Sequence, residues 1–287
     1  IIKTFLNGLK YFMMKITMMT FKLIFSKCYV FFILFNSCFT SSLLYAHEFW
    51  LVPHGKIQQD KTVSISARVG AVWPGEQIVR LPNMVESLQV YYGNSAKGQS
   101  LTGRDNSHVF GHYKVTQPKT QTVILTTRNF SLKLSANEFN AYLREEGLND
   151  TLEFRKKYQL LNDPSHEVFS RIAKTIPYVG QDNSYQHVFN LPLEISILSA
   201  PTNYKIGQKF IIKVTALGKP LSNQFVKAQL QDQKSELLTT RTNQQGIATF
   251  YLPKKGFWRW STVSVQPISY GDVQWKSIWS STTITVY

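Results

Sequence analysis

A histidine directly follows an apolar stretch that ends in alanine, in the sequence LLYAHEFWLV at residues 43–52. If an export protease cuts after Ala46, His47 becomes the first residue of the mature chain. Its free α-amino group and its Nδ1 atom can then chelate one metal ion, and nitrogen ligands of this kind suit Cu, Ni or Zn. The amine must lose its proton to bind, so binding should strengthen from about pH 6 to 8. The alternative is that His47 merely starts an edge strand.

A second imidazole would complete such a site, and the chain holds five further histidines. His108 and His112 are four residues apart, a spacing that places two ligands on one face of a helix. The surrounding HVFGHYKV is typical of strand and turn instead, where four residues span about 13 Å. We therefore predict a site for a divalent transition metal (Ni, Co, Cu or Zn) formed by His47 and His112, with a structural or surface role as the alternative for each histidine. The other histidines are His54, His166 and His187.

Signatures of catalysis are scarce in the sequence. It contains no G-x-S-x-G, no H-E-x-x-H and no glycine-rich phosphate loop. The pair Glu145-Glu146 lies at a predicted helix end, where solvation explains it better than acid–base chemistry. Trp275 and Trp279 would share one face of a strand, which is more typical of core aromatics than of a sugar-binding platform. We predict a protein that binds without catalysis.

The composition allows a large core and disfavours nucleic-acid binding. The chain has 287 residues, of which 43% are hydrophobic, and a formal net charge of +15. Residues 1–46 carry five lysines and no acidic residue, so their removal leaves a chain that is still basic. The remaining charges are scattered and follow no nucleic-acid motif, which indicates solvated surface charge. Both cysteines, Cys28 and Cys38, lie in the same segment, so the rest of the chain has no disulfide.

Residues 1–46 resemble a secretory signal peptide, with an upstream extension as one possibility for its first residues. A basic stretch precedes the apolar YVFFILF at residues 29–35, which is too short for a comfortable transmembrane helix of about 20 residues. Ala46 suits the last position before a cut. An uncleaved anchor and lipidation at Cys38 are the alternatives. We predict a periplasmic protein with no stable membrane insertion after cleavage.

Hydrophobic periodicity divides the rest of the chain into three segments. Residues 47–134 read as short β-strands, because apolar and polar residues alternate, as in KTVSISARVG. Residues 135–190 read as a helical insertion. Residues 191–287 give about seven short, regularly spaced strands, which fits an Ig-like β-sandwich. The predicted fold is mainly β, with an N-terminal β-sandwich-like domain, a helical insertion and a C-terminal Ig-like β-sandwich.

The insertion is predicted to contain three helices. The first begins with a capping box, Ser135 with Glu138 three residues later, and ends at Gly147. The second covers about residues 150–161. The third covers about residues 165–176, where the spacing of the apolar side chains fits a helix and the following proline would end it.

Several stretches resemble a large bacterial periplasmic family. AHEFWLVP resembles its mature start, GAVWPGE resembles its G-x-x-(F/W)-P-G-E, and NEFNAYLREEGL is similar to its helix signature almost letter for letter. SRIAKTIPYVG resembles its R-x-A-K-x-(L/I)-x-x-V-G. The similarity continues through LPLEI, GKPLSN, TTRTNQQGIATFYLPKKGFWRW and DVQWKSIWSSTTITV in the C-terminal sandwich.

This family is usually described as a domain of unknown function, and its members are often named as periplasmic components of nickel or cobalt ABC-type transport. The resemblance implies transition-metal binding outside the inner membrane, with a membrane metal transport complex as the partner. Many relatives have a His-Met pair where this chain has Ser264-Val265-Gln266-Pro267, so no ligand is expected there. Two alternatives stay open: a cell-envelope protein–protein interaction module without metal, and a carbohydrate-binding sandwich that uses exposed tryptophans.

Overall fold

The computed structural model describes residues 47–232 and 236–287, so the predicted signal peptide and its cleavage site lie outside the described residues. Residues 47–287 form one compact unit. The described part is mainly β, as predicted, and its strands form a nine-stranded sheet and two four-stranded sheets. None of its helices is long and apolar enough to cross a membrane.

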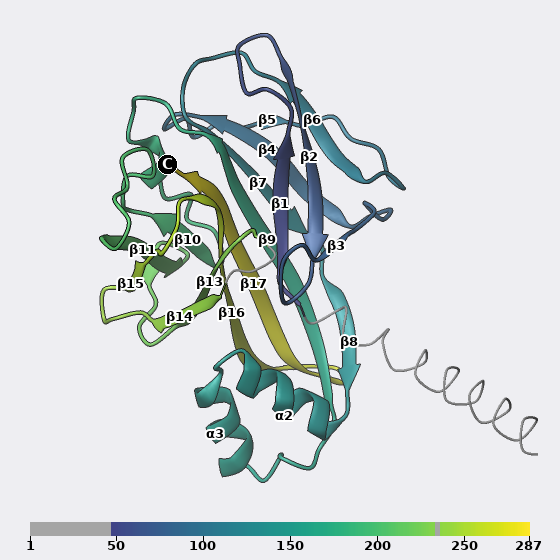
Figure 1. The fold of residues 1–287 in the computed structure, drawn as a ribbon. Coiled ribbons are helices and arrows are strands. Elements are labelled where there is room, and N and C mark those ends of the chain that lie inside the picture. The colour runs from purple at the N-terminus through teal and green to yellow at the C-terminus, as the bar shows by residue number, and fades with distance from the viewer. Residues whose placement is uncertain (1–46, 233–235) are drawn as a thin grey trace, which may run out of the picture. The chain divides into compact units, whose positions relative to one another are not determined.

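The nine-stranded sheet draws its strands from all three predicted segments (Figure 1). Its order is β14-β13-β16-β17-β9-β7-β4-β5, and β8 continues beside β9. Ten register pairs join β9 and β17 in parallel, from Trp275↔Glu167 to Ile284↔Ile176. The bounds are β4 Val85–Tyr92, β5 Gln99–Ser100, β7 Gln121–Thr127, β8 Phe130–Leu134, β9 Ser165–Tyr178, β13 Phe225–Leu230, β14 Leu237–Arg241, β16 Gly256–Tyr270 and β17 Val273–Val286.

The N-terminal β region forms a sandwich, as predicted. A four-stranded sheet packs its apolar face on β4, β7 and part of β9, and the core between them includes Leu51, Ile65, Phe110 and Val123. The alternation read from KTVSISARVG is the alternation of this sheet, since Val63, Ile65, Ala67 and Val69 are buried. The strands of this sheet are β1 Phe49–His54, β2 Thr62–Val69, β3 Glu76–Gln77 and β6 Val109–Lys114.

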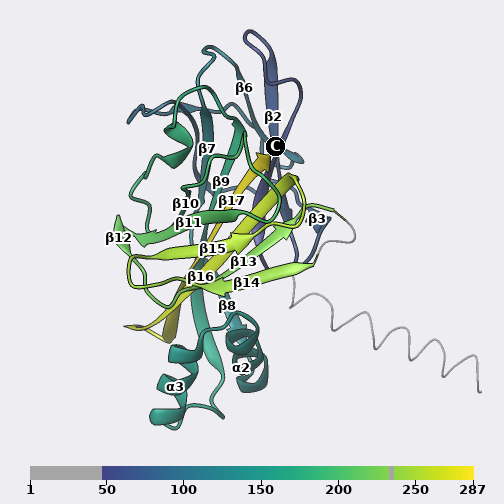
Figure 2. The same ribbon diagram turned by 60° about the vertical axis from the view of Figure 1, so that its left-hand side comes forward.

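The C-terminal region forms the predicted Ig-like sandwich. A second four-stranded sheet lies over β13, β16 and β17 (Figure 2). The core between the layers is aromatic, because the ring of Phe210 stacks on Trp260 at 4.9 Å and Trp258 lies beside it. The strands of this sheet are β10 Glu194–Ile197, β11 Lys209–Ala216, β12 Lys219–Pro220 and β15 Ile247–Tyr251.

Two helices cover one end of the nine-stranded sheet (Figure 1). Helix α2 (Ala136–Glu145) begins with the predicted capping box, in which Glu138 N–H donates to the Ser135 hydroxyl and the Glu138 carboxylate accepts from Ser135 N–H. Helix α3 (Asn149–Lys157) follows. The helices pack on Trp275 and Trp279, which are 2% and 5% exposed. The tryptophans are therefore core residues, as expected, and offer no platform to a sugar.

The third predicted helix is wrong, because residues 165–178 form strand β9. Most of this strand is buried on both faces, and polar residues such as Glu167 and Lys174 are buried along with the apolar ones, so its sequence shows no clean alternation. The spacing of Val168, Phe169 and Ile172 fits a helix equally well, although the β-branched residues of the segment favour a strand. The segment 135–190 is consequently helical only in α2, α3 and a short 3₁₀ turn at Ser184–Gln186.

Candidate metal centre

The half-buried His47 lies directly before β1, and β1 is held from two sides. Along one edge, β1 pairs with β2. From the nine-stranded sheet, the hydroxyls of Ser281 and Thr283 donate to the carbonyl oxygens of Phe49 and Leu51 at 2.6 and 3.0 Å. The strand that follows His47 is thus tied into the fold, as the sequence indicated.

The structure does not bring the two predicted ligands together. In the register of the N-terminal sheet, His54 of β1 pairs with Ser64 of β2, and Ser64 pairs with His112 of β6. His47 precedes His54 by seven residues, which corresponds to about 23 Å along an extended chain. One imidazole therefore lies at each end of the sheet, and no single metal ion can bind both.

His112 instead lies in one row with His54. Residues that pair directly across antiparallel strands point to the same face, so His54, Ser64 and His112 share the outer face of the sheet. Two strand spacings separate the histidines, about 10 Å between their Cα atoms. Both side chains are exposed and the small Ser64 lies between them. Two imidazoles at this separation can reach an ion held above the serine.

The environment of His54 favours the neutral form that a metal needs. Its Nε2 lies 2.7 Å from the hydroxyl of Ser66, which fixes the ring and leaves Nδ1 available. Partial burial, and next the nearby Arg68, lower the pKa of His54 below its usual value. A neutral imidazole is the metal-binding form of histidine, so this residue does not have to release a proton near neutral pH.

The donor set fits a transition metal only as an open site. The described residues hold no group of three or more His, Cys, Asp and Glu side chains that could hold a metal ion. The pair of imidazoles supplies two nitrogen donors, and solvent would supply the others. Paired imidazoles with exchangeable positions suit Cu, Ni or Zn and do not suit Ca or Mg, which prefer oxygen ligands.

The remaining histidines do not add a ligand to this row. His108 is exposed in the loop before β6. The ring of His187 packs edge-on against Phe189 at 4.7 Å, a structural role. His166 lies on β9 of the nine-stranded sheet, outside the four-stranded sheet that carries the row.

A buried ionic cluster, which the sequence did not predict, lies next to His47. The ammonium of Lys227 on β13 binds the carboxylates of Glu48 and Glu146, with Nζ to Oε1 distances of 3.0 and 2.6 Å. Burial, and next the Glu48 charge, raise the pKa of Glu146 to about 7 against the attraction of Lys227. Although burial favours the neutral amine, the two carboxylates raise the pKa of Lys227 above its usual value. No metal is needed to compensate these carboxylates.

The motifs AHEFWLVP and GAVWPGE meet beside this cluster, and Trp50 of the first motif lies between them. The guanidinium of the fully buried Arg259 lies 4.3 Å above the centre of the Trp50 ring and donates to the carbonyl oxygens of Gly70 and Ala71. Gly75 of GAVWPGE has φ +60°, and a Cβ there would lie 2.7 Å from the Val69 carbonyl oxygen. A side chain at this turn would push the chain away from the tryptophan.

Glu146 reaches Lys227 because α2 ends beside it. Gly147 follows with φ +63°, and a Cβ at this position would meet the Phe225 ring at 2.6 Å. The guanidinium of Arg241 also donates to the Gly147 carbonyl oxygen. The LREEGL motif thus ends a helix and places a carboxylate in the cluster, and the expectation that the Glu145-Glu146 pair is merely solvated holds for the exposed Glu145 alone.

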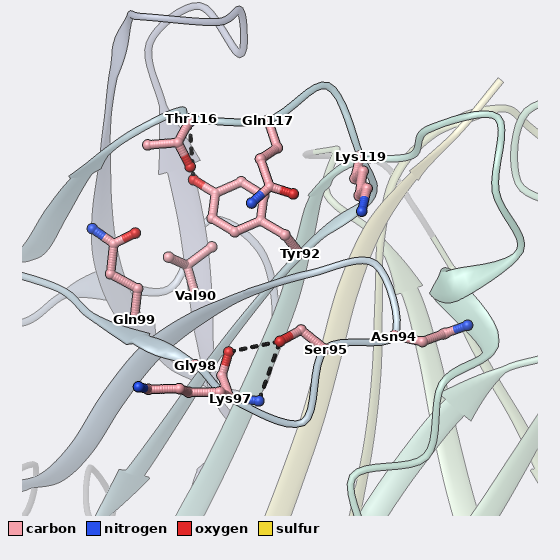
Figure 3. A pocket seen from close by; sticks show the side chains of 10 residues that line it. All are labelled: Val90, Tyr92, Asn94, Ser95, Lys97, Gly98, Gln99, Thr116, Gln117 and Lys119. Atoms are coloured by element: carbon pink, nitrogen blue, oxygen red, sulfur yellow. Dashed lines mark hydrogen bonds between the residues drawn. The ribbon is translucent and has the colours of Figure 1, made fainter.

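A polar pocket of about 630 Å³ opens between two loops of the N-terminal region (Figure 3). One wall is the turn after β4, in which the Ser95 hydroxyl donates to the Lys97 carbonyl oxygen. The other wall is the loop before β7, where Thr116 N–H donates to the Tyr92 hydroxyl at 3.3 Å. The pocket contains no histidine or carboxylate, so it is no metal site. Its lining is Val90, Tyr92, Asn94, Ser95, Lys97, Gly98, Gln99, Thr116, Gln117 and Lys119.

Comparison with known proteins places the chain in a family. Residues 44–266 match the family described as a domain of unknown function, DUF4198. The chain belongs to the DUF4198 family. The match covers β1, the buried cluster and the His54–His112 row, so these features lie within the family's own region. This confirms the resemblance at the level of the family.

Two other comparisons add little to this DUF4198 protein. No curated protein matches it. Among solved structures it is similar to the "D0-D1 domain of Intimin", with 15% sequence identity over 83% of this chain and 97% of that chain, at a TM-score of 0.20. At that score the likeness carries no argument about fold or function.

Proposed function

We propose that the protein binds a divalent transition metal outside the cytoplasm, at a site that is not catalytic, and supports nickel or cobalt uptake. The observation that carries the proposal is the row His54–Ser64–His112 on the open face of the N-terminal sheet. This keeps His112 as a ligand and replaces His47 by His54. The periplasmic location rests on the signal-like residues 1–46, and the link to uptake rests on the family resemblance.

The geometry suits a protein that passes a metal ion on. A site with two imidazoles and exchangeable solvent positions binds less tightly than a closed four-ligand site and leaves room for a partner's ligand. Both histidines are exposed, so a second protein can approach the ion. An inner-membrane metal transport complex is the partner that this proposal implies.

Titration of the untagged protein with Ni²⁺, Co²⁺, Cu²⁺ and Zn²⁺ at about pH 7.5 tests the proposal. We expect one ion per chain with micromolar affinity for at least one metal. His54→Ala and His112→Ala should each weaken binding at least about tenfold, because a single imidazole is a poor site. His108→Ala is the matched control, since it removes an exposed histidine four residues from His112 and should leave the affinity unchanged.

The same titration separates the alternatives. Loss of binding in His47→Ala, with His54→Ala unaffected, would assign the ion to the chain terminus and overturn the row. Absence of binding to all four metals in the wild type would favour an envelope interaction module. A carbohydrate could not stack on Trp275 and Trp279, which are buried beneath α2 and α3, so binding of a glycan would have to use the half-buried Trp73.

A further inference from the structure

Three polar side chains from distant parts of the chain meet at the far end of the nine-stranded sheet. Ser131 lies on β8, His166 on β9, and Asp272 in the turn between β16 and β17. The Ser131 hydroxyl oxygen is 2.7 Å from Nε2 of His166. Nδ1 of the same ring is 3.1 Å from Oδ2 of Asp272. Serine on Nε2 and aspartate on Nδ1 is the connectivity of a serine hydrolase triad.

The register of β8 and β9 creates this arrangement. Lys133 pairs with His166 and Ser131 pairs with Val168, so Ser131 and His166 are diagonal neighbours on one face. Leu132 and Leu134 point the other way, into the core beneath the helices. The serine and the imidazole thus lie on the face of the sheet that the helices do not cover.

The imidazole is held in place while the serine is accessible. The side chain of His166 is 14% exposed, and its backbone N–H donates to the side-chain oxygen of Gln274 at 2.7 Å. Ser131 is exposed. A fixed base beside an accessible hydroxyl is the geometry that general-base activation of a nucleophile requires.

Asp272 is the looser member of the three. Its side chain is 72% exposed and Nδ1 of His166 is not aligned with it for a hydrogen bond, although the distance is 3.1 Å. Catalytic hydrogen bonds are often poorly aligned without substrate and tighten in the complex. The hydrogen bond from Lys133 is the main cause that lowers the pKa of Asp272, and the charge of His166 acts in the same direction. The carboxylate is thus available to orient the ring.

We propose that Ser131, His166 and Asp272 form a second, catalytic site that hydrolyses short carboxylic esters. Ser131 Oγ attacks the ester carbonyl carbon while its proton passes to His166 Nε2. The bond from the carbonyl carbon to the alcohol oxygen then breaks, and His166 returns the proton to the departing alkoxide. Water, deprotonated by His166, cleaves the acyl-serine to give the acid and regenerate the hydroxyl. Asp272 is a positioning residue throughout.

The charge beside the serine suits this reaction. Lys133 is two residues from Ser131 on the same strand and the same face. Its ammonium lies 3.3 Å from Asp272 Oδ2, so one positive charge stands beside the site and can stabilise an oxyanion that forms there. The site lies on an open sheet face, which can enclose little of a bound acyl group. We therefore expect it to accept small acyl groups.

The test uses a fluorophosphonate probe and p-nitrophenyl acetate on the purified protein. We expect the probe to label Ser131, as located by peptide mass spectrometry, and we expect Ser131→Ala and His166→Gln to lose at least about tenfold of the hydrolysis rate. Ser264→Ala is the matched control, a half-buried serine on β16 of the same sheet. Label on another residue, or equal hydrolysis by Ser131→Ala, would overturn the proposal.

The variant Asp272→Asn tests whether Asp272 orients the His166 ring or only stabilises the fold. This variant should lower kcat with KM nearly unchanged, and Asp272→Glu should recover part of the loss; a change in KM alone would remove Asp272 from the proposal. Thermal unfolding of each variant establishes that the fold is intact. Hydrolysis should be unaffected by His54→Ala, so failure of this proposal and failure of the metal proposal give different results.

Discussion

Two buried lysines lie on opposite faces of the nine-stranded sheet, and they differ in the number of carboxylates that they bind. Lys174 on β9 has one carboxylate partner, Glu194, with an Nζ to Oε1 distance of 2.8 Å. Lys227 on β13 has two, Glu48 and Glu146. The first site pairs one carboxylate with one ammonium, whereas at the second two carboxylates share the ammonium of Lys227 and are also attracted by the buried guanidinium of Arg259.

The pKa values of the carboxyl groups follow this difference. Burial alone would raise the pKa of Glu194, but the Lys174 ammonium and the backbone N–H groups of Phe189 and Leu191 lower it below its usual value. At the other site, burial and the Glu48 carboxylate raise the pKa of Glu146 to about 7. The comparison teaches that a buried lysine with one carboxylate forms a permanent ion pair. A buried lysine that two carboxylates share forms a cluster that takes up a proton near neutral pH.

The largest effect is expected from Lys227→Met. Removing one partner of a buried ion pair typically costs about 3–5 kcal/mol, and here the loss leaves two carboxylates facing each other. Urea unfolding at about pH 8 should show a greater loss for Lys227→Met than for Lys174→Met, where backbone donors still hold Glu194. An equal or greater loss in Lys174→Met would break the comparison.

A second prediction concerns the pH dependence of stability. Because the pKa of Glu146 is raised from 4.5 to about 7, the folded state keeps a proton that the unfolded state releases. The stabilisation is fully present below about pH 4.5 and is lost as the pH rises through about 7. Glu167, buried beside Ser277, has its pKa raised to about 7 by burial and acts with the same sign.

Unfolding free energies measured from about pH 5 to 8 test this sign. Glu146→Gln should flatten the decline of stability between these values, and the remaining slope should respond to Glu167→Gln. Glu153→Gln is the control, since its exposed side chain lies on the neighbouring helix α3 and is not among the charges that shift the pKa of Glu146. A slope that Glu146→Gln leaves intact would show that Lys227 keeps both carboxylates ionised.

The smallest effect is expected from Ser196→Ala. The Ser196 hydroxyl donates to Glu194 Oε1 at 3.4 Å, a long hydrogen bond beside an already satisfied carboxylate. Its removal should cost less than about 1 kcal/mol by thermal or urea unfolding. A loss comparable to that of Lys174→Met would mean that the Lys174 site depends on its neutral donors more than on its ion pair.

Local patterns predicted local structure well. The capping box at Ser135 and Glu138 located α2, and the alternation around Ile65 located β2, because both signals act within one turn or one strand. Strand β9 was missed because burial on both faces removes the alternation on which strand prediction depends.

Candidate sites were harder to predict because they depend on register. Nothing in the sequence says that His54 and His112 flank Ser64, or that Lys227 meets Glu48 across 179 positions of the chain. The same holds for Ser131 and His166, which pair diagonally between β8 and β9. The spacing of histidines suggested His112 as a ligand, but only strand pairing could supply its neighbour.

The parallel pairing of β9 with β17 has a consequence for the order of events during synthesis. Trp275–Ile284 of β17 lie between β16 and β9, so the middle of the largest sheet is built from the last described strand. A ribosome or a secretion channel that has released residues only up to about 270 has delivered most of the described strands but not β17. Contacts of such long sequence separation are slow to form. The largest sheet therefore cannot join its two halves until β17 has emerged.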